Sequence, residues 1–305
     1  MNFEVVIPSR WNISTLKNIC SCISEQSVLP DNVHVIIDKF ISKDEFDVLK
    51  YFLTKDLNKD LFNFVCNLNY NFCPNVGVSY ARNFGIKLVK SEYMYMIDDD
   101  NVFNSNFFQD TLTQYQKIFW QLWNDIFLSP SILYRKTWRV QSQWIKYFNP
   151  FLSKVKLKKI KNKDYVKVKM IWWNSLFGKT ENFKKIMFDE YFKFVYEDLD
   201  FTWKASNKWI KIIVSNCLFI NHMEREKSIT ERSFVWDPDV AYQKARNRIM
   251  LIRNNAWFFT RKVFFVSGLW IQTFWFIFLV IFFGKWSKKS ILKSIIKWTY
   301  DWIRY

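Results

Sequence analysis

The sequence predicts an α/β fold in which a mixed, mostly parallel sheet is flanked by helices and followed by C-terminal hydrophobic helices. Short apolar segments typical of strands alternate with segments of helical spacing. The expected strands are apolar on both faces, as in a sheet covered by helices on both sides. Residues 263–284 then carry no charge at all. With 305 residues, the chain is long enough for one large domain or two small ones.

The expected strands lie, in chain order, at residues 3–7, 33–37, 61–68, 93–97 and 210–214. Helical spacing is found between the first four of them, at residues 16–23, 46–53 and 78–89. Ligands of such sheets bind beyond the carboxyl ends of the strands. Asp38 and the run Asp98, Asp99 and Asp100 follow strands in this way.

The net charge of +17 is one-sided, because residues 1–150 are neutral and residues 151–305 carry all of it. A basic half indicates an anionic partner such as lipid, a phosphorylated substrate or nucleic acid, while a solvated basic face is the plain alternative. Five cysteines without a CxxC pair, and an N-terminus that reads as a strand instead of a signal peptide, favour free thiols in a reducing cytoplasm.

The tail differs from the rest of the chain. Residues 263–284 are flanked by Arg261, Lys262 and Lys285, and about 20 apolar residues suffice to span a bilayer. Residues 285–305 have the composition of a basic interfacial helix. We therefore divide the chain into a catalytic domain, 1–255, and a membrane-associating tail, 256–305. A buried core helix is the alternative, and spanning, re-entrant and in-plane arrangements stay open.

The stretch "MYMIDDDN" places three adjacent carboxylates at a strand end. Such a cluster suits a hard divalent cation, Mg²⁺ or Mn²⁺, which would offset the repulsion and leave coordination positions for phosphate oxygens. A solvated turn with helix-capping aspartates is the competing interpretation.

Five motifs occur in order: "VVIPSRWN", "VIIDKF", "ARN" before "YMIDDDN", "YEDLDFTWKA" and "NHMEREK". In this combination residues 1–255 resemble the family 2 glycosyltransferases. The resemblance implies the GT-A fold, a Rossmann-like architecture, and an enzyme that uses a nucleotide-diphosphate sugar.

On the donor side, the resemblance implies roles for the matched positions. Pro8, Arg10, Asp38, Arg82, Asp98 and Asp99 would bind the nucleotide sugar, with Asp38 on the base and Arg82 near the diphosphate or bracing the aspartates. Asp100 would ligate the metal. His222 would be a further ligand or a phosphate contact, unless it is an ordinary surface histidine.

On the acceptor side, the resemblance makes Asp198, paired with Glu197, the catalytic base, and Trp172, Trp173 and Asp200 parts of the acceptor loop. One base opposite the leaving group gives a single displacement with inversion. A helix N-terminus that favours carboxylates would explain "YEDLDF" equally well. The QxxRW motif of processive synthases is absent, which favours single additions. Eight lysines within residues 154–169 predict a flexible basic arm over the site, or an ordinary solvated insertion.

Residues 241–259 resemble the aromatic-RN-apolar helix of membrane-associated, rhamnosyltransferase-like enzymes that build surface polysaccharides. We therefore expect a glycan or lipid-linked acceptor, an anionic membrane surface as partner, and a location at the cytoplasmic face of the cell membrane. Nucleic acid is not expected, since the charge lies beside an apolar tail. A catalytically inactive membrane scaffold is the alternative function.

Glycine is scarce, with 5 residues, and tryptophan abundant, with 16. Trp172, Trp173 and Trp209 stand where the family favours glycine. We hypothesise that UGA codons, read as glycine in some bacterial codes, are translated here as tryptophan. A genuinely tryptophan-rich, membrane-seeking protein is the alternative, and UGG codons at these positions would establish it.

Overall fold

The computed structural model describes residues 1–9, 13–37, 42, 44, 47, 67–73, 75–134, 144–149, 154–157, 163–172, 174–193, 195–223, 238–283 and 288–303. The helix expected at residues 46–53 lies outside the described residues apart from residue 47. The strand expected at residues 61–68 falls mostly outside them as well, and the observed third strand begins at residue 67.

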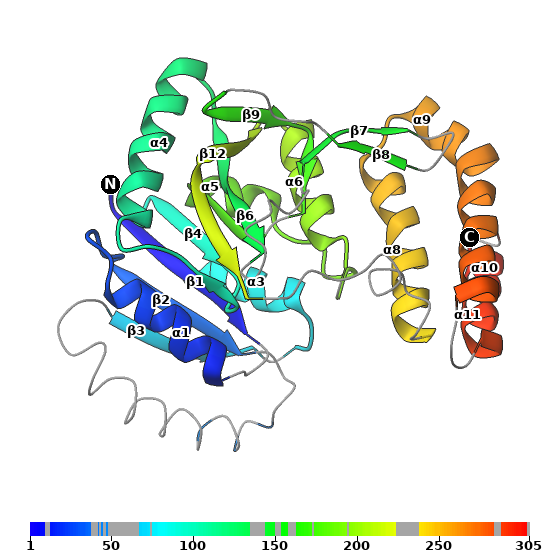
Figure 1. Ribbon diagram of the computed structural model, residues 1–305, viewed down its shortest axis with the longest axis horizontal. Coiled ribbons are helices and arrows are strands. Elements are labelled where there is room, and N and C mark those ends of the chain that lie inside the picture. Colours follow the sequence, from blue (N-terminus) through cyan, green and yellow to red (C-terminus); the bar gives the residue numbers. More distant parts are fainter. Residues whose placement is uncertain are drawn as a thin grey trace.

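Within the described residues, nine strands form one sheet (Figure 1). They are β1 (Phe3–Ser9), β2 (Asn32–Ile37), β3 (Asn67–Phe72), β4 (Tyr93–Ile97), β5 (Asn101–Val102), β6 (Ile126–Tyr134), β9 (Tyr165–Val168), β11 (Ser175–Lys179) and β12 (Lys211–His222). Their order is β3-β2-β1-β4-β11-β6-β12-β5, and β9 pairs with β12. Strands β1 to β4 run parallel, as do β6 and β12, whereas β11 lies antiparallel between β4 and β6. The predicted mixed, mostly parallel sheet is thus confirmed.

Helices cover both faces of this sheet because successive strand residues point to opposite sides. Val5 and Ile7 of β1 join the core under α1 (Ile13–Ser24) and α4 (Phe107–Leu122). Val6 joins the opposite core, which α3 (Val78–Leu88), α5 (Thr180–Ile186) and α6 (Glu197–Asn207) complete. The helices expected near residues 16–23 and 78–89 are confirmed by α1 and α3.

The lysine-rich segment is more ordered than predicted. Its residues Tyr165–Val168 form β9, which pairs antiparallel with β12, so this part belongs to the sheet and is not a flexible arm. Residues Lys154–Leu157 form β8, which joins β7 (Trp144–Asn149) and β10 (Met170–Ile171) in a small second sheet. Backbone pairing with strands distant in the sequence, which the charge pattern does not reveal, orders these parts of the segment.

The C-terminal part is a helical layer at one end of the molecule (Figure 1). It contains α8 (Pro238–Asn255), α9 (Phe258–Val263), a π-helical turn η1 (Phe264–Gly268), α10 (Leu269–Phe283) and α11 (Lys288–Ile303). One apolar cluster joins Leu199 and Trp203 of α6 to Ile252 of α8 and to Phe264. Side chains from both sides of the predicted boundary at residue 255 therefore share a core, and the division itself stays a prediction.

Two tryptophans have backbone angles that favour glycine. Trp123 ends α4 with φ 45°, and Trp209 follows α6 with φ 67°. Both side chains are exposed, at 75% and 84%, so packing does not compensate for the conformation. Trp172 is not among the residues with positive φ, and Trp173 lies outside the described residues. The codon hypothesis stays a prediction.

Replacing Trp209 or Trp123 by glycine should raise the free energy of unfolding by about 1 kcal/mol each. A left-handed conformation is strained for a residue with a side chain, and glycine has none. Trp120→Gly is the matched control: this exposed tryptophan lies within α4, where glycine should lower stability by about 1 kcal/mol. Urea unfolding measures all three. Equal losses at the three positions would contradict the backbone assignment.

Candidate active site

The carboxyl ends of the parallel strands bring distant parts of the sequence to one edge of the sheet. Ser9 ends β1, Asp98 follows β4, and His222 ends β12. His222 also lies opposite Asn101 of the short strand β5. The acidic run and the histidine, which are more than a hundred residues apart, therefore meet at this edge.

Each aspartate of the run has its own partner. Ser9 donates a hydrogen bond from Oγ to Asp99 Oδ2 (2.5 Å), and His222 Nε2 lies 2.9 Å from Asp100 Oδ2. Burial raises the pKa of Asp98 to about 6, with Asp100 and Asp99 adding to the rise and Arg82 opposing it. Burial likewise raises the pKa of Asp99, against the hydrogen bond from Ser9. Negative charge on the run is therefore unfavourable by itself, and a nearby cation would stabilise it.

Arg82 joins this run to the second acidic motif. Its guanidinium is 2% exposed and pairs through Nη2 with Asp98 Oδ1 (3.0 Å) and through Nη1 with Glu197 Oε1 (3.1 Å). Burial acts to lower the pKa of Arg82, but the charges of Asp98, Glu197 and Asp198 keep it above its ordinary value. The two motifs, predicted to share a site, are therefore brought together by a single buried side chain.

The second motif forms the first turn of α6. Glu197 and Asp198 are its first two residues, so the positive end of the helix dipole faces their carboxylates. Asp198 is 9% exposed, and its Oδ1 accepts a hydrogen bond from the backbone N–H of Leu199 (2.7 Å). The helix-dipole and catalytic interpretations of this motif are compatible in this geometry.

Two asparagines that the sequence did not single out hold the acidic turn in shape. Asn101 donates to the carbonyl of Asp98 (2.9 Å), and Asn174 donates to Asn101 Oδ1 (2.7 Å). The backbone N–H of Asp98 in turn donates to the carbonyl of Asn174 (2.8 Å). Asn101 directly follows the aspartates and Ser9 lies within the motif "VVIPSRWN", but neither was given a role; nothing in the sequence pointed to Asn174.

Asp200 of α6 bonds to residues of α6 and α8. It is fully buried, pairs with Lys204 (2.6 Å) and accepts a hydrogen bond from Asn255 of α8 (2.7 Å). Burial raises its pKa, and Lys204 and Asn255 oppose the rise. These contacts give Asp200 a structural position between two helices. Trp172 is half-buried and packs against the cluster that joins α6 to α8.

The remaining predicted positions divide in two. Pro8 is buried in β1, where it lies beside Ile36 of β2. Arg10, Asp38 and Trp173 lie outside the described residues. The binding and acceptor-loop roles given to these residues stay predictions.

The chemistry of the acidic turn fits a divalent cation. Asp100 Oδ1 is buried and has no hydrogen-bond partner within the described residues, while Asp100 Oδ2 faces His222. In the described part of the chain, no group of three or more His, Cys, Asp or Glu side chains could hold a metal unaided. Mg²⁺ commonly uses one or two protein carboxylates and completes its shell with substrate phosphates. Asp100 and His222 are the residues that would hold such an ion here.

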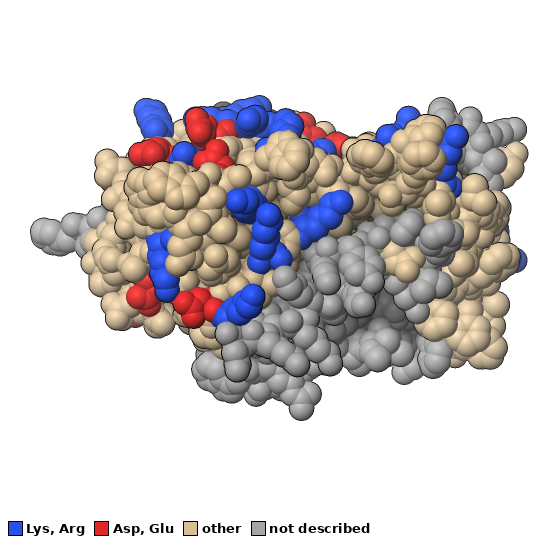
Figure 2. Space-filling view, turned by 90° about the horizontal axis from the view of Figure 1, so that it is seen from above, with Lys and Arg blue, Asp and Glu red and all other residues tan. Residues whose placement is uncertain are grey.

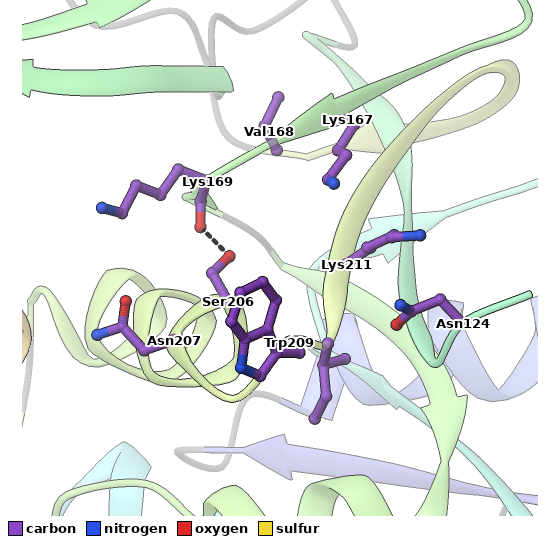
Figure 3. A pocket seen from close by; sticks show the side chains of 9 residues that line it. Asn124, Lys167, Val168, Lys169, Ser206, Asn207, Trp209 and Lys211 are labelled. Carbon is purple, nitrogen blue, oxygen red and sulfur yellow. Dashed lines mark hydrogen bonds between the residues drawn. The ribbon is translucent and has the colours of Figure 1, made fainter. Parts of the chain in front are cut away.

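A separate hollow of about 550 Å³ lies at the opposite edge of the sheet, where β6 and β12 begin. Figure 2 shows Lys and Arg dispersed over the upper face of the molecule with Asp and Glu among them. Within the hollow, Lys169 points toward the Trp203 ring (5.0 Å) and Lys211 donates to the carbonyl of Leu122 (3.2 Å), so these lysines diverge (Figure 3). We assign no ligand to it.

Comparison with known proteins gives a family and a fold. Residues 5–186 match the family described as Glycosyl transferase family 2. S. aureus TarS 1-349 is 18% identical and covers 98% of this chain and 81% of its own, with a TM-score of 0.58. The same protein in complex with UDP-GlcNAc is 17% identical and covers 98% of this chain and 82% of its own, with a TM-score of 0.59. GalNAc-T7 with UDP, GalNAc and Mn2+ is 15% identical and covers 89% of this chain and 56% of its own, at 0.57. No curated protein matches the chain.

Arg82→Met should lower the free energy of unfolding by about 3 kcal/mol, because it leaves Asp98 and Glu197 as unpaired, largely buried charges. The matched control is Lys117→Met, which removes an exposed pair with Asp164 and should leave stability unchanged. Urea unfolding at neutral pH compares them. Similar stability of Arg82→Met and the parent chain would show that the guanidinium is not the link between the motifs.

Proposed function

The chain belongs to glycosyl transferase family 2, and on that premise we propose that it is an inverting enzyme that moves a sugar from a nucleotide-diphosphate sugar to an acceptor hydroxyl. The observation that carries the proposal is the buried Arg82, which pairs with Asp98 on the donor side and with Glu197 beside the candidate base. Such a transfer needs both a group that stabilises the departing diphosphate and a carboxylate that accepts the acceptor's proton.

On the donor side, Asp98 and Asp99 are proposed to bind the ribose or the phosphates, and the hydrogen bond from Ser9 fixes the orientation of Asp99. Asp100 and His222 are proposed to hold Mg²⁺ or Mn²⁺. A bound divalent cation supplies charge stabilisation to the leaving diphosphate. The asparagine network around Asp98 keeps the turn in place, so these side chains need no rearrangement when the donor binds.

On the acceptor side, Asp198 is proposed as the general base. Its carboxylate would take the proton of the acceptor hydroxyl as the oxygen attacks the anomeric carbon from the face opposite the diphosphate, which inverts the configuration. The helix dipole of α6 and the nearby Arg82 favour the ionised carboxylate before the reaction. Glu197 is held in its ion pair and is proposed to orient Arg82.

We further propose that the acceptor is a lipid-linked glycan of surface-polysaccharide synthesis, used at the cytoplasmic face of the cell membrane. The support is the C-terminal layer: among the described residues, one helical segment, Phe258–Phe282, is long and apolar enough to cross a membrane. The basic charge of the second half of the chain suits anionic lipid heads.

Asp198→Asn should lower the transfer rate by about 10²- to 10⁴-fold, the usual contribution of a general base, and leave donor binding intact. Asp110→Asn is the control, because this carboxylate is exposed in the first turn of α4. Product formation from a panel of nucleotide sugars, and calorimetric donor binding, provide the two readouts.

Chelation followed by Mg²⁺ or Mn²⁺ should abolish and restore transfer in the parent chain. Full activity of Asp198→Asn would refute the assigned base. Donor binding without transfer in the parent chain, across the whole panel and with metal present, would favour the inactive scaffold.

A further inference from the structure

The C-terminal helices have a continuous exposed apolar stripe. Among the described side chains between residues 258 and 282, ten large hydrophobic ones are at least 42% exposed: Phe258, Phe259, Val266, Trp270, Ile271, Phe274, Trp275, Phe278, Ile281 and Phe282. From residue 266 they recur every four residues, so they lie along one side of the helix over about 36 Å from Phe258. Phe264, Leu269 and Val280, on the other side, are buried.

Three arrangements in a bilayer are compatible with length alone: spanning, re-entrant and in-plane. The neighbouring helix decides between them. α11 packs against both α10 and α8, and the three run side by side (Figure 1). If α10 crossed the bilayer, α11 would be drawn in alongside it.

α11 carries exposed lysines along its length. Lys293 and Lys297 lie about 8 and 14 Å along the helix from Lys288. A lysine near the centre of the hydrocarbon is strongly disfavoured, because its charge loses its hydration there. α8, which packs against α11, carries two further charged residues, Arg246 and Arg253. Spanning would bury several charges, whereas an in-plane helix leaves them at the level of the lipid head groups.

We propose that α9, η1 and α10 lie in the plane of an anionic lipid surface with the stripe immersed, and that α10 does not cross the bilayer. The lysines of α11 then pair with lipid phosphates at the edge of the stripe. This docking mode is independent of the sugar-transfer chemistry.

The first test measures binding to vesicles of equal parts phosphatidylglycerol and phosphatidylcholine by co-sedimentation. The double variant Phe274→Glu with Phe278→Glu should lose about tenfold or more in binding, as two exposed apolar contacts are replaced by charges. Trp120→Glu is the matched control, because it is an exposed aromatic on α4 at the other end of the molecule (Figure 1). Unchanged binding of the double variant, or self-association of the parent chain without vesicle binding, would overturn the proposal.

The second test separates in-plane from spanning. Lys262→Cys and Lys288→Cys place thiols beside the two ends of the stripe, in a Cys66→Ser, Cys217→Ser background; Cys217 is the cysteine that is exposed among the described residues. On intact vesicles, a membrane-impermeant maleimide added outside should label both. Labelling of one thiol only until detergent is added would establish a spanning helix.

A second inference comes from the backbone before α6. Val195 and Tyr196 both have left-handed angles, φ 65° and 72°, directly before the candidate base motif. This conformation is unfavourable for residues with a side chain, and a β-branched residue rarely adopts it. Such strain persists only where surrounding contacts hold it.

Asn247 of α8 provides that contact. It is fully buried and donates from Nδ2 to the carbonyl of Val195 (2.8 Å). Arg246 Nε donates to Asn247 Oδ1 (3.0 Å), which orients the amide, and Arg246 also donates to the carbonyl of Tyr191 (2.7 Å). The Arg248 side chain hydrogen-bonds that of Tyr196. The "ARNR" segment of α8 thus holds the turn through hydrogen bonds.

The geometry points to Asn247 as a positioning residue, which holds the strained turn so that the first turn of α6 presents Glu197 and Asp198 to the site. Its amide bonds the carbonyl of Val195 and the side chain of Arg246, and it acts on the candidate base through the turn. This inference rests on the proposed function for its kinetic readout, and on backbone geometry for its structural one.

Asn247→Ala should lower kcat about 10- to 100-fold and leave the KM for the donor unchanged, because only the base side is displaced. In a Val195→Gly background, where the left-handed turn is free of strain, the same change should cost less than about threefold. Asn254→Ala is the control, since Asn254 of α8 bonds the side chain of Asp189 on the surface. Asn247→Asp keeps the shape, removes the N–H donor and serves if alanine impairs folding.

Equal loss of kcat in both backgrounds, or no loss, would overturn the assignment. Thermal unfolding of the parent chain, Val195→Gly, Asn247→Ala and the double variant measures the coupling between the two positions without an activity assay. If the parent chain transfers no sugar but the unfolding coupling is present, the proposed function fails and the positioning role stands.

Discussion

The structure depends on a conflict of charge that one side chain resolves. Three aspartates follow β4, and Glu197 and Asp198 open α6 nearby. Carboxylates so close together repel each other, and partial burial disfavours their charged forms. Arg82 enters between them from α3 and pairs with one carboxylate of each group. Without the guanidinium, the end of β4 and the start of α6 would each carry an uncompensated charge.

The negative charge that Arg82 does not balance fits the proposed divalent cation. Asp98 keeps a pKa raised to about 6 despite Arg82, and Asp100 retains a buried oxygen without a partner within the described residues. A site that is still short of positive charge after its internal pairing attracts a cation, and a cation attracts a diphosphate. The parallel sheet supplies the place, because six of its strands end at the same edge.

The sequence predicted the parts of the fold that rest on periodicity. β1, β2, β4, α1 and α3 have clear apolar spacing and were expected near their observed positions. β9 was hidden by lysines, since its stability comes from pairing with β12 and not from its own composition. Within the described residues the third strand, Asn67–Phe72, alternates asparagine with apolar residues, a strand pattern that the expected range 61–68 includes only in part. Aspartates, Arg82 and His222 were found through motifs, whereas Ser9 and Asn174 act through contacts between distant residues that no local pattern reveals.

The most direct test of the central claim is calorimetric titration of uridine, thymidine and guanosine diphosphates into the parent chain and into Asp100→Ala, each with and without Mn²⁺. If the acidic edge of the sheet is a cation-dependent diphosphate site, one nucleotide should bind saturably with Mn²⁺, weakly without it, and weakly to Asp100→Ala in both conditions. Binding of equal strength in all four combinations, or no binding by any nucleotide, would contradict the claim.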